Sequence, residues 1–214
     1  MLLAGTTAIA VMGCGSREQS SGFLGDPVPS PIVINEVMAY NSGSVLNSDM
    51  QELGRMQQES DDDAGVVGDV SNVDIGSYGD WIELYNTSEE DVDLGGYFVS
   101  DTLKNPFKAE LPEGLVVPAE GYLLIWADGY DGEPMEHFKY HHLPFRLSNS
   151  GNDSVVLYSP RGQLVELVGY PAAVEGAEGS FARYPDGTGD FEFCTAPTAN
   201  GPNGSRCHGD SSAP

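Results

Sequence analysis

The chain has 214 residues, of which 33 are acidic and 9 are basic, so its formal net charge is −24 at pH 7. Such a polyanion repels nucleic-acid backbones and anionic lipids, which argues against nucleic-acid binding and favours cations or basic partners. The 27 glycines and 14 prolines predict many turns rather than long helices, and the length suits one large β domain.

The N-terminal segment from Met1 to Gly13 is uncharged and mostly apolar. It is too short to span a bilayer and a polar tract follows it, so it predicts the apolar core of a secretion signal. Residues 11–14 resemble the bacterial lipobox, which implies a lipid on Cys14 and anchoring in the bacterial cell envelope. Gly15 does not resemble an inner-membrane retention signal, so we expect the outer membrane. No Lys or Arg precedes the apolar run, which leaves open an upstream start site or a segment, such as a buried strand, that is not a signal.

Two polar stretches flank the first predicted strand, which covers residues 32–39. Residues 14–30 are rich in Ser, Gly and Pro, which is typical of a flexible, disordered linker. Residues 41–79 form an acidic insertion with eight acids against one base, Arg55, and are interpreted as a solvated loop with a local charge of −7. The acids are Asp49, Glu52, Glu59, Asp61, Asp62, Asp63, Asp69 and Asp74. Inside the insertion, Ser48 is predicted to cap a short helix over residues 49–58.

The clearest strand pattern lies at residues 79–86. Trp81, Glu83 and Tyr85 alternate there with Ile82 and Leu84, so a period of two places the apolar pair on one face and the larger amphipathic residues on the other. Residues 92–101 read as two further strands around a glycine bend. Together these segments predict a β-meander.

Further short strands are predicted at residues 105–110, 115–117, 121–126 and 191–194. The clearest hairpin pairs residues 155–158 with 163–168, because Pro160 and Gly162 stand where a type I turn favours them. Tyr184-Pro-Asp-Gly187 is predicted to repeat this turn chemistry. About ten short strands with regular turns are typical of a β-sandwich.

Five segments, in order, resemble the lamin tail domain family as it occurs in exported bacterial proteins. They are Pro31–Val37, residues 80–101 with their Asp-Trp-Ile-Glu-Leu-Tyr-Asn opening, Gly121–Trp126, Phe145–Leu157, and a closing part at residues 183–187 and 195–200. The resemblance implies an all-β, immunoglobulin-like β-sandwich over residues 31–207, with a tail at 208–214 and no catalytic machinery of its own. We therefore expect a lipid-anchored module that binds an envelope protein or glycan and meets the membrane through its lipid alone.

The three cysteines fit this compartment. Once Cys14 is assigned to a lipid, Cys194 and Cys207 remain as an even pair. A disulfide between them would close a short ring in the C-terminal region and contribute about 3 kcal/mol through chain entropy. It would also suit an oxidising exterior.

Patterns for catalysis are mostly missing. His137, His141 and His142 cluster, but their spacing and the nearby prolines favour a surface loop over a zinc site. No Gly-x-Ser-x-Gly elbow or glycine-rich phosphate loop occurs. The alternative function is a metal-dependent, phosphodiesterase-like hydrolase or an accessory subunit of one, because related modules occur beside such enzymes.

The acidic composition also predicts weak calcium binding. Candidate ligands are Glu36, Asp80, Glu83 and Asp101, because a carboxylate within an otherwise apolar strand must be paired or coordinated if it is buried. Asp61 to Asp63 could add ligands if the insertion folds back over the first strand. Salt bridges to Arg146 or Arg183 are the alternative, and these two bases could satisfy one or two of the carboxylates.

Overall fold

A computed structural model describes residues 26–51, 78–132, 138–150, 153–172, 179–204 and 207. Within these ranges the chain is almost entirely β-structure, with a short helical segment at residues 48–51. The strands are Ile32–Met38 (β1), Asp80–Asn86 (β2), Val92–Asp93 (β3), Phe98–Ser100 (β4), Ala109–Glu110 (β5), Val116–Val117 (β6), Tyr122–Ala127 (β7), His141–His142 (β8), Asp153–Tyr158 (β9), Leu164–Tyr170 (β10), Ser180–Tyr184 (β11) and Asp190–Cys194 (β12). No helix in the described ranges is long and apolar enough to cross a membrane.

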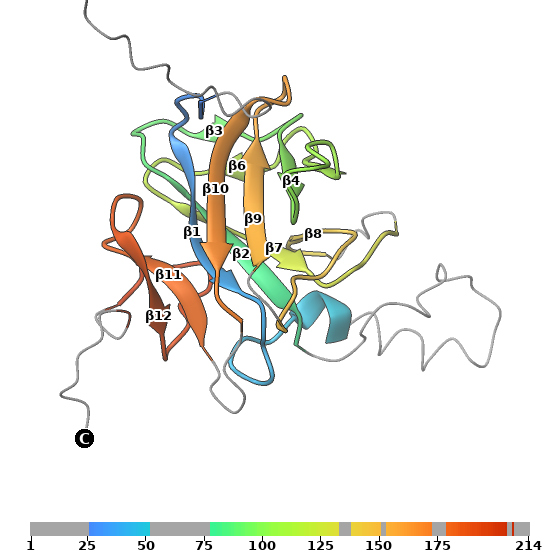
Figure 1. Cartoon of the computed structure of the whole chain (residues 1–214), viewed down its shortest axis with the longest axis vertical. Coiled ribbons are helices and arrows are strands. Elements are labelled where there is room, and N and C mark those ends of the chain that lie inside the picture. Colours follow the sequence, from blue (N-terminus) through green and yellow to red (C-terminus); the bar gives the residue numbers. More distant parts are fainter. Residues whose placement is uncertain are drawn as a thin grey trace, which may run out of the picture.

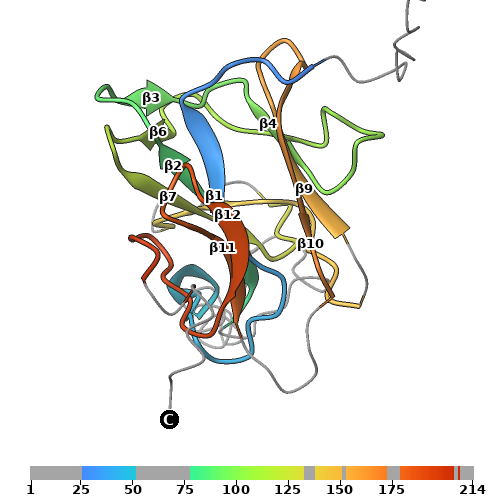
Figure 2. The ribbon, with the colours of Figure 1, turned by 60° about the vertical axis from the view of Figure 1, so that its left-hand side comes forward.

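Two sheets make a β-sandwich. One has six strands in the order β12-β11-β1-β2-β7-β8, and the other has four in the order β10-β9-β4-β5. Figure 1 shows β9 and β10 in front of β1 and β2, and the turned view in Figure 2 separates the two layers. A small third sheet pairs β3 with β6 at one end. The immunoglobulin-like sandwich that the sequence predicts is therefore the observed architecture.

The main core lies between the sheets and is built from alternate residues of each strand. Ile34, Ile82 and Ile125 face it from the six-stranded sheet, and Val155 and Leu157 face it from the other. All are fully buried. Burial of each side chain contributes about 1.5–3 kcal/mol, so this layer is the main source of stability.

The outer face of the six-stranded sheet is also buried, which the sequence pattern does not predict. Trp81 lies opposite Trp126 on the neighbouring strand, and both are fully buried with Met38. Tyr140 and Ala199, which lie outside this sheet, pack against them. The period of two in β2 is correct, but its amphipathic face lies under a third layer instead of facing solvent.

The predicted meander is wrong. The strand β2 pairs with β1 and β7, β3 pairs with β6, and β4 belongs to the other sheet, where it pairs with β5 and β9. The predicted segments are strands, but none of the three pairs with another of them. Local periodicity cannot show which strands pair with each other.

The predicted hairpin of β9 and β10 is confirmed. Its turn is closed by a hydrogen bond from the Gly162 N–H to the Ser159 carbonyl at 2.8 Å. Gly162 adopts a positive φ of 70°, which disfavours a side chain. The second predicted turn differs, because the Tyr184–Pro185 peptide bond is cis and the Gly189 N–H donates to the Pro185 carbonyl.

The start of the acidic insertion is packed against the sandwich. Asn47, not Ser48, caps the helical segment, because its side-chain oxygen accepts a hydrogen bond from the Met50 N–H at 3.1 Å. Asp49 and Met50 are buried. The expectation of a solvated loop therefore fails for this part, while residues 52–77, with the other seven acids, lie outside the described residues.

The predicted linker also meets the sandwich before its end. The Val28 N–H donates to the Leu164 carbonyl at 2.8 Å, and the Val28 side chain packs against the main core. The folded region therefore includes Val28, three residues before the predicted start at residue 31. Residues 1–25, including Cys14, lie outside the described residues.

One polar clamp joins the two sheets at an irregularity in β1. The register of β1 against β2 shifts between Ile34 and Glu36. The Ile34 N–H donates to Glu166 of β10 at 2.6 Å, and the Ile34 carbonyl accepts from Arg183 of β11 at 2.9 Å. Arg183 also forms an ion pair with Glu166. Both polar groups of the Ile34 backbone are therefore satisfied by side chains from other strands.

We predict that Glu166→Ala lowers the free energy of unfolding by about 3 kcal/mol, because it leaves the Ile34 N–H without its acceptor and the largely buried Arg183 guanidinium without its carboxylate partner. Urea unfolding followed by tryptophan fluorescence measures this loss. Glu89→Ala, at an exposed position, is the control and should change the free energy by less than about 0.5 kcal/mol. Equal stability of the two variants would contradict the clamp.

Candidate functional site

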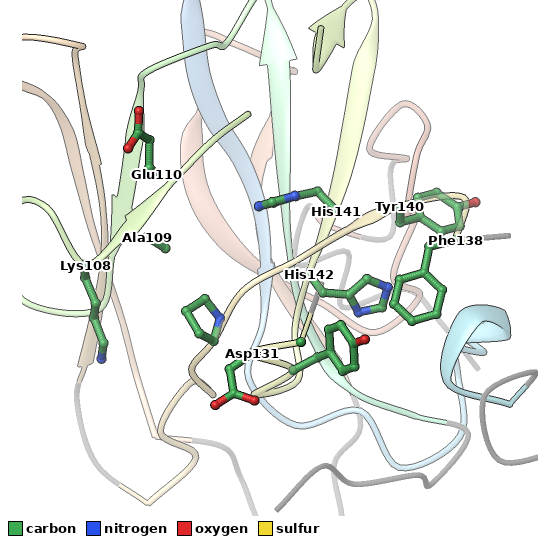
Figure 3. Close-up of a pocket in the computed structure, with 11 residues that line it drawn as sticks. Lys108, Ala109, Glu110, Asp131, Phe138, Tyr140, His141 and His142 are labelled. Atoms are coloured by element: carbon green, nitrogen blue, oxygen red, sulfur yellow. The ribbon is translucent and has the colours of Figure 1, made fainter. Parts of the chain in front are cut away.

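A pocket of about 300 Å³ opens between the edges of the two sheets. Strand β8 is the last strand of the six-stranded sheet, and β5 is the last strand of the other. Figure 3 shows Lys108 and β5 on one side of the pocket, with His141, Phe138 and Tyr140 on the other. The pocket therefore lies where the sandwich is open, in the size range of small-ligand sites.

Aromatic rings pack together along one wall of this pocket. The ring of Phe138 lies 5.2 Å from Tyr130 and 4.6 Å from His142, measured between centroids. Tyr140 meets Trp126 edge-on at 6.3 Å, which connects the wall to the outer-face cluster. Because the rings support one another, the wall is held in place before any ligand binds.

His142 fixes this wall to the rest of the sandwich. Its Nδ1 lies 2.8 Å from Asp128, which also accepts from Asn47 at 2.9 Å. Its Nε2 lies 3.5 Å from Asp49, and Asp49 accepts from the backbone N–H groups of Lys139 and Tyr140 at 2.8 and 3.0 Å. These contacts join the start of the acidic insertion to β7 and β8.

His141 points to the opposite side of β8 from this network and lines the pocket. Its burial lowers its pKa to about 4, and the charge of His142 beside it adds to the effect. The His141 side chain is therefore neutral at pH 7. His137 lies outside the described residues, so the predicted histidine cluster is described only for His141 and His142, which form a short strand parallel to β7 instead of a loop.

Among the described residues that line the pocket, Lys108 is the only lysine or arginine. Its Nζ lies 2.5 Å from Asp101 and 4.5 Å from the centre of the Phe145 ring. Asp101, one of the predicted calcium ligands, forms this ion pair with Lys108. Glu110 and Asp131 line the same pocket and are exposed to solvent.

The other predicted calcium ligands lie away from the pocket. Glu36 and Glu83 stand opposite each other on β1 and β2 and are fully buried. Ser180 and Thr198 donate hydrogen bonds to Glu36, and Asn35 donates to Glu83 at 3.0 Å. The two carboxyl groups are thus satisfied by hydrogen bonds, not by the salt bridges to Arg146 or Arg183 that are the alternative in the sequence analysis.

Asp80 lies at the far end of β2 and accepts a hydrogen bond from the Leu147 N–H at 3.2 Å. The structure therefore brings Glu36 and Glu83 together, but not Asp80 or Asp101. Across the described ranges, no three His, Cys, Asp or Glu side chains form a group that could hold a metal ion. Asp61 to Asp63 lie outside those ranges, and calcium binding stays a prediction.

The segment after β12 covers the buried carboxyl pair. The Gly201 N–H donates to Glu83 at 3.1 Å, and Asn203 donates to the Arg183 carbonyl at 2.9 Å. The predicted disulfide between Cys194 and Cys207 is present and closes this segment into a ring. The disulfide therefore stabilises the cover over Glu36 and Glu83.

Burial raises the pKa of Glu83 to about 8, and the neighbouring Glu36 adds to this effect. The pKa of Glu36 is raised as well, because burial outweighs the hydrogen bonds from Ser180 and Thr198 that favour its ionised form. Two ionised carboxylates side by side in a buried site would repel each other. At neutral pH the pair therefore holds at least one proton.

Sequence reasoning missed the pocket and most of its residues. The sequence does carry a usable signal, because Tyr130, Phe138 and Tyr140 are concentrated beside the histidines in the stretch predicted to be a surface loop. Glu110 and Asp131 carried no such signal, since acids are abundant throughout the chain.

The Lamin Tail Domain family model matches residues 26–172, which is more than half of the chain. The match covers β1 to β10 and the pocket. It ends before β11, β12 and the disulfide, so the closing segments at 183–187 and 195–200 lie outside it. No curated protein matches the chain.

The raised pKa of Glu83 predicts a pH-dependent stability. Because the folded state keeps this proton between about pH 4.5 and 8 while the unfolded state releases it, the free energy of unfolding should fall as the pH rises through this window. The contribution is about 1.4 kcal/mol per pH unit. Glu83→Gln should flatten the decline measured by urea unfolding between pH 5 and 8, with Asp190→Asn as an exposed control. Parallel curves for wild type and Glu83→Gln would contradict the assignment.

Proposed function

The chain belongs to the lamin tail domain family, and on this premise we propose that it is a non-catalytic binding module of the bacterial cell envelope. The observation that carries the binding role is the pocket between β5 and β8. It lies at strand ends and loops on the rim of a rigid sandwich, which is where β-sandwich proteins commonly place their binding sites. The partner is an envelope protein or glycan.

The disulfide supports the export of the chain. Structural disulfides form and persist outside the cytoplasm, and the bond between Cys194 and Cys207 closes a cover over buried polar groups. The high negative charge adds to this argument, because it disfavours contact with nucleic acids and anionic lipids. Contact with a membrane then depends on a lipid anchor.

The anchor that we propose is a lipid on Cys14. The support is the apolar stretch before it, Gly13 directly preceding it, and a polar tract that would hold the folded domain away from the bilayer. Gly15 favours the outer membrane over the inner one.

The lipid anchor is tested by metabolic labelling with a fatty acid in a two-membrane bacterium that expresses the full chain. Label should be present on the wild type and absent from Cys14→Ser, because the thiol is the attachment atom. Density fractionation should place the wild type with the outer membrane. Unchanged labelling of Cys14→Ser would refute the anchor.

The binding role is tested by capture of partners from envelope extract. The immobilised chain should retain a protein or glycan that beads alone do not. A second form, which lacks residues 54–75, tests whether the acidic insertion or the folded sandwich binds the partner. The deletion begins after Met50 because Asn47, Asp49 and Met50 are packed against the sandwich. If neither form enriches any component, the binding role is wrong.

A further inference from the structure

We infer that the anchored protein also rests on the surface of the bilayer, through the outer face of its four-stranded sheet. This contact goes beyond the lipid anchor, which the sequence analysis takes as the only contact with the membrane, and it rests on the proposed attachment at Cys14. The side chains that make the contact are two apolar groups and two bases: Phe107, Leu167, Lys104 and Arg161.

The outer face of the four-stranded sheet is apolar and lies under a covering segment. Val156 and Tyr158 of β9 alternate with residues of the main core, so they point away from that core. Both are nonetheless buried. The segment between β4 and β5, residues 101–108, covers them, and the Tyr158 hydroxyl lies 3.5 Å from the Leu103 carbonyl. Figure 2 shows this segment on the side of β9 that faces away from β1.

Two apolar side chains remain exposed on this face. Phe107 in the covering segment is 59 % exposed, the largest fraction for a large apolar side chain among the described residues. Its ring meets Phe98 edge-on at 4.9 Å and lies against Gly162, where a Cβ atom would be 2.5 Å from it. Leu167 of β10 pairs with Val156 and is 43 % exposed. These contacts hold the Phe107 ring in an exposed position, and such apolar patches mark interaction surfaces.

Two bases in the same region have no carboxylate partner. Lys104 lies in the covering segment, and Arg161 precedes Gly162 in the turn that the Phe107 ring touches. Both are exposed, and within the described ranges neither forms an ion pair. Unpaired bases are unexpected in a chain with 33 acids and 9 bases. Bases beside exposed apolar groups suit a partner with anionic groups at an apolar boundary, which is the structure of a lipid headgroup layer.

The N-terminal chain joins the fold beside this face, which favours a bilayer over a soluble acidic protein. The Val28 N–H donates to the carbonyl of Leu164, the first residue of β10, at the end of the β9–β10 turn. Figure 1 shows residues 26–31 beside the start of β10. Residues 15–27 join Cys14 to Val28, and a flexible chain of this length has a root-mean-square extent of about 20 Å. The anchor therefore keeps this part of the sandwich within reach of the bilayer.

The net charge of −24 limits the contact to the anchored form. Acids elsewhere repel an anionic bilayer, so the free chain gains little from two bases. An anchored chain is held at high local concentration, and charges farther away than about 8 Å are screened at physiological ionic strength. Among the described strand residues that point outward from this sheet, Glu110 is the only acid, and Asp101 in the covering segment is paired with Lys108.

The test supplies the anchor chemically. The disulfide between Cys194 and Cys207 leaves Cys14 as the remaining thiol of the full chain. The unlipidated full chain is coupled through this thiol to a maleimide lipid in nanodiscs of phosphatidylcholine and phosphatidylglycerol. A gadolinium headgroup lipid in the same nanodiscs broadens the NMR signals of residues that lie near the bilayer.

Broadening is expected at residues 103–107, at residues 161–163 and at Leu167. It should be absent at Asp190 on β12, which lies at the end of the other sheet. Equal broadening of all these signals, or none at the first three, would overturn the inference.

Two charge reversals locate the contact. Lys104→Glu and Arg161→Glu change exposed side chains without ion pairs, and each should weaken docking at least about fivefold. The matched control is Lys139→Glu, which makes the same change in charge at an exposed position before β8 of the other sheet. It should leave the broadening unchanged. An equal loss in the control would show an effect of net charge alone and overturn the inference.

The result is independent of metabolic labelling at Cys14. If the cellular protein carries lipid but the coupled chain shows no local broadening, the anchor stands and the bilayer contact is wrong. If the cellular protein carries no lipid, the anchor fails, whereas local broadening of the coupled chain still supports the affinity of this face for lipid. Signal shifts with a soluble acidic peptide, acetyl-Glu-Leu-Glu-Phe-Glu-amide, but no broadening in nanodiscs, would assign the face to a protein and overturn the inference.

Discussion

The burial of two facing carboxyl groups, Glu36 and Glu83, is the constraint on which the arrangement of this domain depends. A carboxyl group without solvent contact is strongly destabilising unless donors surround it, and a sheet alone supplies none on its outer face. The donors come from Asn35 and from the chain after β10, chiefly Ser180 and Thr198. The region beyond the family match is therefore an integral part of the fold, and the disulfide holds its last turn in place.

The same outer layer explains why the pocket has a firm wall. Residues at the start of the acidic insertion, the segment around Tyr140 and the C-terminal cover all pack on one face of the six-stranded sheet. His142 joins two of these segments through Asp128 and Asp49. The segment at residues 138–142 is thus held by hydrogen bonds to Asp49 on one side and to Asp128 on the other. A preformed site loses less conformational entropy on binding, which favours affinity.

Strand positions could be predicted from the sequence, because alternation and turn chemistry are local properties: β2, β7 and the hairpin of β9 and β10 lie close to where they were expected. Pairing could not be predicted, since β3 pairs with β6 and β4 lies in the other sheet between β5 and β9, which no local pattern indicates. The disulfide between Cys194 and Cys207 could be predicted by counting cysteines once Cys14 is assigned to a lipid, and the structure contains this disulfide. The donors to Glu36 and Glu83 could not be found, because Ser, Thr and Asn near the C-terminus carry no pattern that marks them as covering a distant strand.

The way this chain accommodates its excess of acids also bears on the pocket. Basic side chains neutralise Asp101 and Glu166, but other carboxylates accept backbone N–H groups instead: Asp93 accepts from Gly95 and Gly114, and Asp91 from Ala119. Such bonds order loops without cancelling charge, so the negative potential of the surface remains. A polyanion stabilised in this way attracts cations over its whole surface, and only local geometry can select among them. The pocket between β5 and β8 adds a concave shape and a wall of aromatic rings, and that combination distinguishes it from the acidic surface around it.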